Sequence, residues 1–302
     1  MSRKVIVTVA PTGGIANKQQ SPNLPTQPLE IAETVARCCD LGASIAAIHA
    51  RRPEDDGATC RPEIYEEINT LVRERCDIVI NNSTAGGING DVIGAEQAVG
   101  MDVLDFDHRL GGADASPEMS TADTWTDVAS FGGTDLLIDT PPSKSERLVR
   151  HLQDRGVKPE WEVMQPAHIL KGMIPLCAAG YDEPPYFANI VLGIAAFQNA
   201  LPYTPRLLQM MVDLLPPDSI FCVSAIGPAQ LPATTAGILL GGHVRVGLED
   251  NLYLSAGRLA TNEELVERTV RIIRELGHEP ATPAEAREMI GLPARVAVGR
   301  AR

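Results

Sequence analysis

The sequence contains few aromatic residues and no long apolar run. Phe, Trp and Tyr together account for 4% of its 302 residues, whereas 44% are hydrophobic. A core must therefore be built mainly from aliphatic residues and alanine, which suits the branched aliphatic interior of an α/β barrel. No stretch approaches the ~18 consecutive apolar residues of a transmembrane helix. The N-terminal residues read as a strand rather than as a signal peptide, and we expect a cytoplasmic protein.

The sequence also lacks a cysteine motif and an excess of basic residues over acidic ones. None of the six cysteines has C-x-x-C spacing, which favours free thiols and disfavours zinc held by cysteine. The formal net charge of −13 argues against nucleic acid or an anionic membrane as the main partner. A phosphorylated small molecule stays open as a ligand, because a local site can be basic on an acidic protein.

Short β-branched runs alternate with longer amphipathic segments along the whole chain. Eight such units without a break in composition predict a parallel sheet, and eight strands suggest closure into a barrel. An open doubly wound sheet is the alternative, but no G-x-G-x-x-G follows the first strand and no phosphate-binding G-x-x-x-x-G-K-[ST] occurs. We therefore predict an α/β protein, a (β/α)8 TIM barrel forming one domain over residues 1–302, with a short C-terminal helical extension.

The expected elements follow from periodicity and helix-start signals. Strands are expected at residues 5–9, 44–49, 77–82, 118–122, 160–164, 187–192, 219–224 and 243–247. Helices are expected at residues 28–41, 62–75, 92–99, 144–155, 168–179, 206–215, 230–239 and 262–276. Thr261 with Glu264 forms a capping box before the last of these, and Thr282 with Glu285 begins the extension in the same way.

Polar residues at the carboxyl ends of the strands are the candidate site, because barrel active sites lie there. On the last strand, Arg245 and Glu249 share one face by strand parity, which leaves Asp250 on the rim. His243 lies six residues before Glu249, roughly 20 Å along a strand, and is predicted to be a core histidine. Strand five contributes Glu160 and Glu162 as further strand-end candidates.

Each candidate interaction has two interpretations. His49, at the end of strand two, and Glu249 suit zinc or a similar divalent ion, but one His and one Glu more often form a hydrogen-bonded pair. Arg245 and Asp250 suit a charge-assisted catalytic pair or a structural salt bridge. Ser83 and the glycines after it suit an oxyanion-binding loop or a tight turn.

Longer motifs match a known family. The most specific covers residues 241–251, and further ones lie at residues 12–13, 21–25, 48–51, 83–87, 117–119 and 281–283. Through these residues the chain resembles, essentially from end to end, the β-keto acid cleavage enzymes, and among them those like the 3-keto-5-aminohexanoate cleavage enzyme.

The resemblance implies a zinc-dependent (β/α)8 barrel that forms homo-oligomers, dimers or tetramers. Such an enzyme condenses a β-keto acid with acetyl-CoA and releases acetoacetate and a new acyl-CoA by a retro-Claisen step. It implies that His49 and Glu249 bind Zn²⁺ or another divalent metal, and that Asp250 acts as a base together with Arg245. The substrate-binding residues that it implies are Ser83, Thr121, Gly86, Gly87 and Thr12.

The strand-two motif departs from the family pattern. Where the family has H-x-H-x-R, this chain has Ala47 in place of the first histidine. A catalytic zinc normally has three protein ligands, and zinc affinity should fall sharply with two. His168, at the start of the helix after strand five, and His108 are the candidates for a substitute ligand.

Two loops depart as well. Ile15 occupies the position where the 3-keto-5-aminohexanoate cleavage enzyme has a Glu suited to an amino group, which disfavours a cationic substrate tail. Pro228 follows Gly227 where the family commonly has an Arg, which weakens the expectation of acetyl-CoA as co-substrate. Two other functions therefore stay open at this point. One is a metal-dependent lyase or hydrolase of a keto acid that does not use CoA, and the other is a non-catalytic member that has lost the metal.

Overall fold

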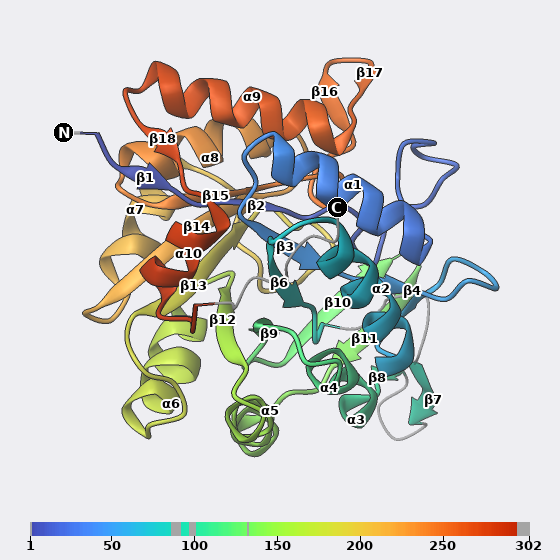
Figure 1. Cartoon of the computed structure of the whole chain (residues 1–302). Helices are drawn as coiled ribbons and strands as arrows, with labels where there is room; N and C mark the ends of the chain where they lie inside the picture. The colour runs from blue at the N-terminus through green and yellow to red at the C-terminus, as the bar shows by residue number, and fades with distance from the viewer. Residues whose placement is uncertain (1, 86–91, 97–100, 132, 295–302) are drawn as a thin grey trace.

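A closed barrel of eight parallel strands forms the centre of the computed structural model, which describes residues 2–85, 92–96, 101–131 and 133–294 (Figure 1). The strands follow one another in chain order around the barrel, and the last pairs with the first. They are β2 (Val7–Val9), β3 (Ile45–Ile48), β6 (Val79–Asn82), β9 (Met119–Ala122), β12 (Lys158–Val163), β13 (Tyr186–Leu192), β14 (Ser219–Ala225) and β15 (His243–Val246). The predicted (β/α)8 fold is confirmed.

Helices cover the outside of this barrel. They are α1 (Pro28–Asp40), α2 (Pro62–Arg75), α5 (Pro142–Asp154), α6 (Ile174–Ala178), α7 (Pro205–Asp213), α8 (Gln230–Leu239) and α9 (Asn262–Glu275). A π-helix, His168–Met173, precedes α6, and it widens just before Pro175, which has no N–H to bond the carbonyl of residue 171. The predicted capping box of Thr261 and Glu264 is present at α9.

A four-stranded sheet beside the barrel replaces one predicted helix. Its order is β10 (Asp127–Phe131), β11 (Thr134–Ile138), β8 (Met101–Leu104) and β7 (Val92–Glu96). The prediction of a helix at residues 92–99 is therefore wrong for residues 92–96, which pair with β8 in antiparallel register. Five residues are too few for periodicity to separate a helix from a strand, and pairing with a neighbouring strand decided it. The short helices α3 (Phe106–Arg109) and α4 (Gly111–Asp114) follow β8.

The remaining strands are short. They are β1 (Lys4–Val5), β4 (Ala50–Arg51), β5 (Ala58–Thr59), β16 (Tyr253–Ser255), β17 (Arg258–Leu259) and β18 (Glu279–Pro280), and a 3-10 turn spans Gly227–Ala229. The expected first strand is divided, because β1 pairs with β18 and only β2 enters the barrel. No helix in the described part of the chain combines the length and the apolar character needed to span a membrane.

The amino-terminal end of the barrel is closed by α10 (Pro283–Ile290), the predicted extension. Ala286 and Ile290 of this helix pack against Ile6 and Phe187, which lie inside that end of the barrel. Arg287 donates to both carboxylate oxygens of Glu118, at 2.5 and 3.1 Å. Because this end is filled, the cavity of the barrel lies at the opposite end, where the strands terminate.

His243 lies deep in the barrel wall, as predicted, rather than in a site. It is 4% exposed, and its Nδ1 accepts a hydrogen bond of 3.0 Å from the backbone N–H of Ile6. Burial lowers the pKa of His243 to about 3, and the charge of Arg3 adds to this effect. The imidazole is therefore expected to be neutral in the folded protein at neutral and mildly acidic pH.

We expect this histidine to make the fold sensitive to acid. In the unfolded chain its pKa is near 6.5, so between pH 6.5 and about 3 the unfolded state binds one proton more than the folded state, and stability falls as the pH falls. Replacing His243 by Asn, which keeps an acceptor, should remove this contribution. Between pH 7.5 and 5, urea unfolding should show wild type losing about 2 kcal/mol more than His243→Asn. Parallel losses in the two proteins would contradict this expectation.

Candidate functional site

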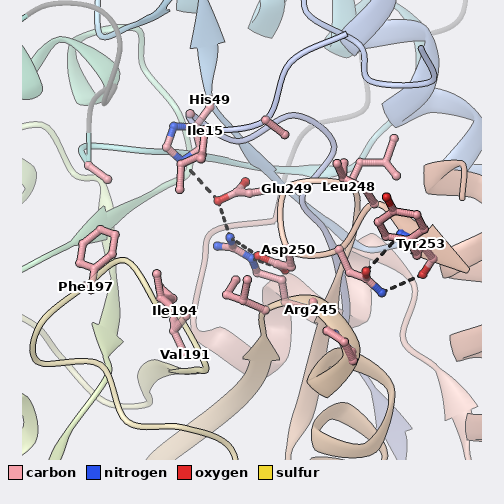
Figure 2. Close-up of a pocket in the computed structure, with 18 of the residues that line it drawn as sticks. Ile15, His49, Val191, Ile194, Phe197, Arg245, Leu248, Glu249, Asp250 and Tyr253 are labelled. Carbon is pink, nitrogen blue, oxygen red and sulfur yellow. Dashed lines mark hydrogen bonds and ion pairs between the residues drawn. The ribbon is translucent and has the colours of Figure 1, made fainter. Parts of the chain in front are cut away.

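A cavity of about 790 Å³ opens at the carboxyl ends of the barrel strands (Figure 2). Its lining comes from segments far apart in the sequence, including the loop after β2, the ends of β12 and β13, and the segment after β15. The ionisable side chains of this lining include His49, Asp123, Glu162, Arg245, Glu249 and Asp250. The four residues predicted to carry catalysis or metal binding, His49, Arg245, Glu249 and Asp250, are therefore brought together in one cavity.

Arg245 and Asp250 form a two-point ion pair. Nε of Arg245 donates to Oδ2 of Asp250 at 3.2 Å, and Nη2 donates to Oδ1 at 3.0 Å. Asp250 is 2% exposed, so its predicted place on the rim is wrong. The strand ends at Val246, and the chain turns at Gly247, where a Cβ would lie 2.0 Å from the carbonyl oxygen of Ala10. This turn breaks strand parity and brings Asp250 back onto Arg245.

Arg245 also contacts two other carboxylates. Its Nη1 donates to Oε1 of Glu162 at 3.1 Å, and its Nη2 donates to Oε1 of Glu249 at 2.5 Å. Asn189 donates to the same oxygen of Glu162 at 3.3 Å. Asp250, Glu249 and Glu162 keep the pKa of Arg245 well above its usual range despite burial. The guanidinium is therefore charged and is held in one orientation from three sides.

The two carboxyl groups after β15 differ in acidity. Burial is the largest influence on the Glu249 carboxyl and would raise its pKa, but Arg245 and His49 outweigh it and lower that pKa to about 2. Burial raises the pKa of Asp250 to about 6, with Arg245 opposing and Glu249 adding to the rise. Asp250 is therefore the more basic carboxylate of the two.

Asp123 and Glu162 form a second acidic region of the cavity wall. Burial raises the pKa of both carboxyl groups, and the charge of Asp123 raises that of Glu162 further. Asp123 accepts a hydrogen bond from Nη2 of Arg109 at 3.4 Å, and Nε of Arg109 donates to the carbonyl of Thr84 at 2.6 Å. Asp123 was not predicted from the sequence, although its place directly after β9 was a signal. Glu162 was predicted only as a strand-end candidate.

The other strand-five candidate, Glu160, lies inside the barrel below the cavity. It is fully buried, and its Oε2 accepts a hydrogen bond of 2.6 Å from Asn81. Burial raises the pKa of Glu160 to about 7. Glu160 and Glu162 project from the same face of β12, so the first lies one layer beneath the second.

His49 and Glu249 supply part of a metal site. Nε2 of His49 lies 3.4 Å from Oε1 of Glu249, and Oε2 of Glu249 is buried without a hydrogen-bond partner. Two donors fit a metal, but Ala47 of β3 offers only a methyl group. Within the described ranges, no three His, Cys, Asp or Glu side chains are grouped so that they could hold an ion. These residues do not assemble the three protein ligands of a catalytic zinc site.

Neither candidate substitute completes that site. Nδ1 of His168 accepts a hydrogen bond of 3.2 Å from the N–H of Met164, and its ring stacks on Trp125 with centroids 5.1 Å apart. Nε2 of His108 accepts a hydrogen bond of 3.1 Å from the N–H of Cys60. Neither histidine is among the residues that line the cavity.

The predicted substrate-binding hydroxyls bond to nearby backbone. Ser83 Oγ accepts from the N–H of Ala85 at 3.0 Å, and Thr121 Oγ1 accepts from the N–H of Thr84 at 2.8 Å. Thr12 Oγ1 donates to the carbonyl of residue 25 at 2.8 Å. None of the three is among the described residues that line the cavity, and their substrate roles stay predictions. Gly86 and Gly87 lie outside the described residues.

A family model and several known proteins match nearly the whole chain. A family model described as the beta-keto acid cleavage enzyme matches residues 4–292. The 3-keto-5-aminohexanoate cleavage enzyme of Fusobacterium nucleatum is 37% identical over 299 residues, 97% of this chain and 99% of that protein. The enzyme of the same name from Acetoanaerobium sticklandii is 35% identical over 292 residues, 96% of this chain and 98% of that protein.

A functionally different relative and a solved structure are also similar. The 3-dehydrocarnitine:acetyl-CoA trimethylamine transferase of Rhizobium meliloti is 31% identical over 303 residues, 98% of this chain and 99% of that protein. The structure of the ternary complex of ObcA with a C4-CoA adduct and oxalate superposes with a TM-score of 0.70 at 21% identity, covering 90% of this chain and 68% of that one. At 21% identity, this superposition shows a shared fold and nothing about function.

Proposed function

Because the chain belongs to the family of beta-keto acid cleavage enzymes, we propose that its cavity condenses a β-keto acid with acetyl-CoA and releases acetoacetate and a new acyl-CoA. The observation that carries this proposal is Asp250, a buried carboxylate that lines the cavity with both oxygens held by Arg245. Relatives whose names specify acetyl-CoA as co-substrate support the reaction class.

Asp250 is the proposed base. Carbon 2 of a β-keto acid lies between a keto group and a carboxylate, so its proton is acidic enough for a carboxylate to remove. The two hydrogen bonds from Arg245 fix the direction in which Asp250 faces the cavity. Glu162 on the far side of the guanidinium keeps Arg245 from turning away. Arg245 and Glu162 are therefore positioning residues for the base.

The reaction needs no nucleophile from the protein. Asp250 takes the proton from carbon 2, and the carbanion forms a C–C bond with the acetyl carbonyl carbon while the CoA thiolate leaves. The thiolate then adds to the original keto carbon. The bond between that carbon and carbon 2 breaks, which releases the new acyl-CoA and the carbanion of acetoacetate. Asp250 returns the proton to carbon 2, which gives acetoacetate and restores the carboxylate.

A metal and an oligomer remain predictions from the family resemblance. His49 and Glu249 provide two donors where three are expected, and the proposal therefore assigns the metal no step. Pro228 lines the cavity at the position where an anion-binding Arg was expected, so any contact with CoA at this place involves other groups. Homo-oligomeric assembly is supported by the family resemblance alone.

Isotope tracing tests the proposed reaction. Purified protein is incubated with acetyl-CoA labelled in the acetyl group and a panel of β-keto acids, and the products are identified by mass spectrometry. We expect the label in acetoacetate and none in the new acyl-CoA. A lyase or hydrolase would consume the keto acid equally well when acetyl-CoA is omitted. That result, or no turnover across a broad panel of acids, would contradict the proposal.

A further inference from the structure

One side of the cavity is made of hydrocarbon. Leu104 comes from β8, Leu136 and Ile138 come from β11, and Val191, Ile194 and Phe197 come from β13 and the loop after it. These six residues are called the apolar wall below. Three of them belong to the four-stranded sheet that lies beside the barrel, so this added sheet supplies half of the wall.

The apolar wall is held rigidly. The ring of Phe197 packs edge-on against Trp125, with centroids 6.1 Å apart, and against Phe131, at 6.3 Å. Backbone hydrogen bonds join the loop to β10, from the N–H of Ser130 to the carbonyl of Ala196 at 2.9 Å and from the N–H of Gln198 to the carbonyl of Val128 at 3.0 Å. The loop therefore presents a fixed surface to the cavity.

Charge is confined to other parts of the cavity. None of the six residues of the apolar wall is ionisable, and the acidic residues of the lining gather around Arg245. In Figure 2, Val191, Ile194 and Phe197 lie on one side of Arg245, and Tyr253 lies on the other. A charged group that entered the space against the wall would lose hydration without gaining a partner, which is costly.

We propose that the apolar wall holds the acyl tail of the β-keto acid, so that this enzyme acts on β-keto acids with an uncharged hydrocarbon tail of medium length. The inference rests on the proposed function, in which the tail is bonded to the keto carbon and leaves with the new acyl-CoA rather than with acetoacetate. The new thioester released by the reaction is then a medium-chain acyl-CoA. Ile15, which lines the same cavity, agrees with this tail because it offers no partner to an amino group.

Chain length is the first test. Unbranched 3-oxo acids with tails of three to seven carbons are compared by kcat/KM with 3-oxoadipate and 5-amino-3-oxohexanoate, which have charged tails. Each added methylene that reaches the apolar wall should raise kcat/KM about fourfold, until the wall is covered. Equal or better turnover of the charged acids, or no rise with length, would overturn the inference while leaving the proposed reaction intact.

Binding without turnover separates the two proposals. Titration calorimetry measures the dissociation constants of the unreactive 3-hydroxy acids with the same tails, in the absence of acetyl-CoA. We expect affinity to rise with tail length by the same factor per methylene. If affinity rises but no β-keto acid turns over, the wall inference stands and the proposed reaction fails. If affinity is independent of tail length, the wall inference fails.

A charge placed in the wall is the second test. Ile194→Asp should lower kcat/KM for the longest acid at least about 30-fold, mainly through KM, and should favour the acid with an ammonium tail. The matched control is Leu239→Asp on α8, which is 68% exposed and should leave all values unchanged. If Ile194→Asp does not fold, Ile194→Ala should still reduce the gain per methylene. Unchanged chain-length dependence in a folded Ile194 variant would overturn the inference.

Discussion

Replacing Asp250 by Asn should lower kcat for acyl-CoA formation by roughly 10²–10⁴-fold, the contribution of a positioned general base. Asn has nearly the same shape and fills the same buried space beside Arg245, but its amide does not accept the proton from carbon 2. KM for the β-keto acid should change much less, because the group acts on the reacting proton. Steady-state kinetics with the acid preferred by the wild-type protein provide the measurement.

The control for this variant must separate catalysis from folding. Asp213→Asn makes the same chemical change on the exposed end of α7, where Asp213 accepts a hydrogen bond from Gln209, and kcat should be unaltered. Circular dichroism and thermal unfolding should show that Asp250→Asn is folded. A folded Asp250→Asn protein with wild-type kcat would show that another group removes the proton.

Replacing Ala47 by His should increase Zn²⁺ affinity by about 100-fold or more. Four-ligand structural sites bind zinc with about 10–16 kcal/mol, so one ligand contributes about 3 kcal/mol. Ala47 lies on β3 and His49 directly follows its last residue, Ile48, and side chains two residues apart on an extended chain share one side. The buried free oxygen of Glu249 is the third donor. Competition with a chromogenic chelator and metal analysis after dialysis give the affinity and the stoichiometry.

The specificity of this gain can be checked within the same protein. Adding His49→Ala to the Ala47→His variant should return zinc affinity to the wild-type value or below it, because one donor is again lost. Wild-type protein should lose zinc on dialysis more readily than Ala47→His. Stoichiometric, tightly held zinc in the wild type would contradict the expectation that the site lacks a protein ligand.

The helices and most barrel strands were predictable because their signals are local. The helices α2 and α8 have the predicted bounds, residues 62–75 and 230–239. The first of these begins with a proline, which suits the first turn of a helix, and carries an amphipathic pattern. Residues 92–96 were not predictable in this way, because β7 depends on its pairing with β8. The same holds for the whole added sheet, which supplies half of the apolar wall.

The candidate site was predictable in part. His49, Arg245, Glu249 and Asp250 were found because barrel sites lie at strand ends and because their motifs match a family. Asp123 was missed although it directly follows a barrel strand, and only its contact with Arg109 depends on how separate segments pack. Asp250 was placed on the rim by strand parity, and the turn at Gly247, which depends on close packing against Ala10, brought it inside.

The sequence alone was enough to establish the eightfold alternation, the aliphatic core, the family and the alanine at position 47 where the family motif has a histidine. These follow from residue types and short spacings, which the chain carries whatever its fold. The three carboxylates that hold Arg245, and the added sheet that supplies half of the apolar wall, became visible in the folded structure. Both depend on contacts between residues that are distant in sequence, and such contacts form only when the barrel closes.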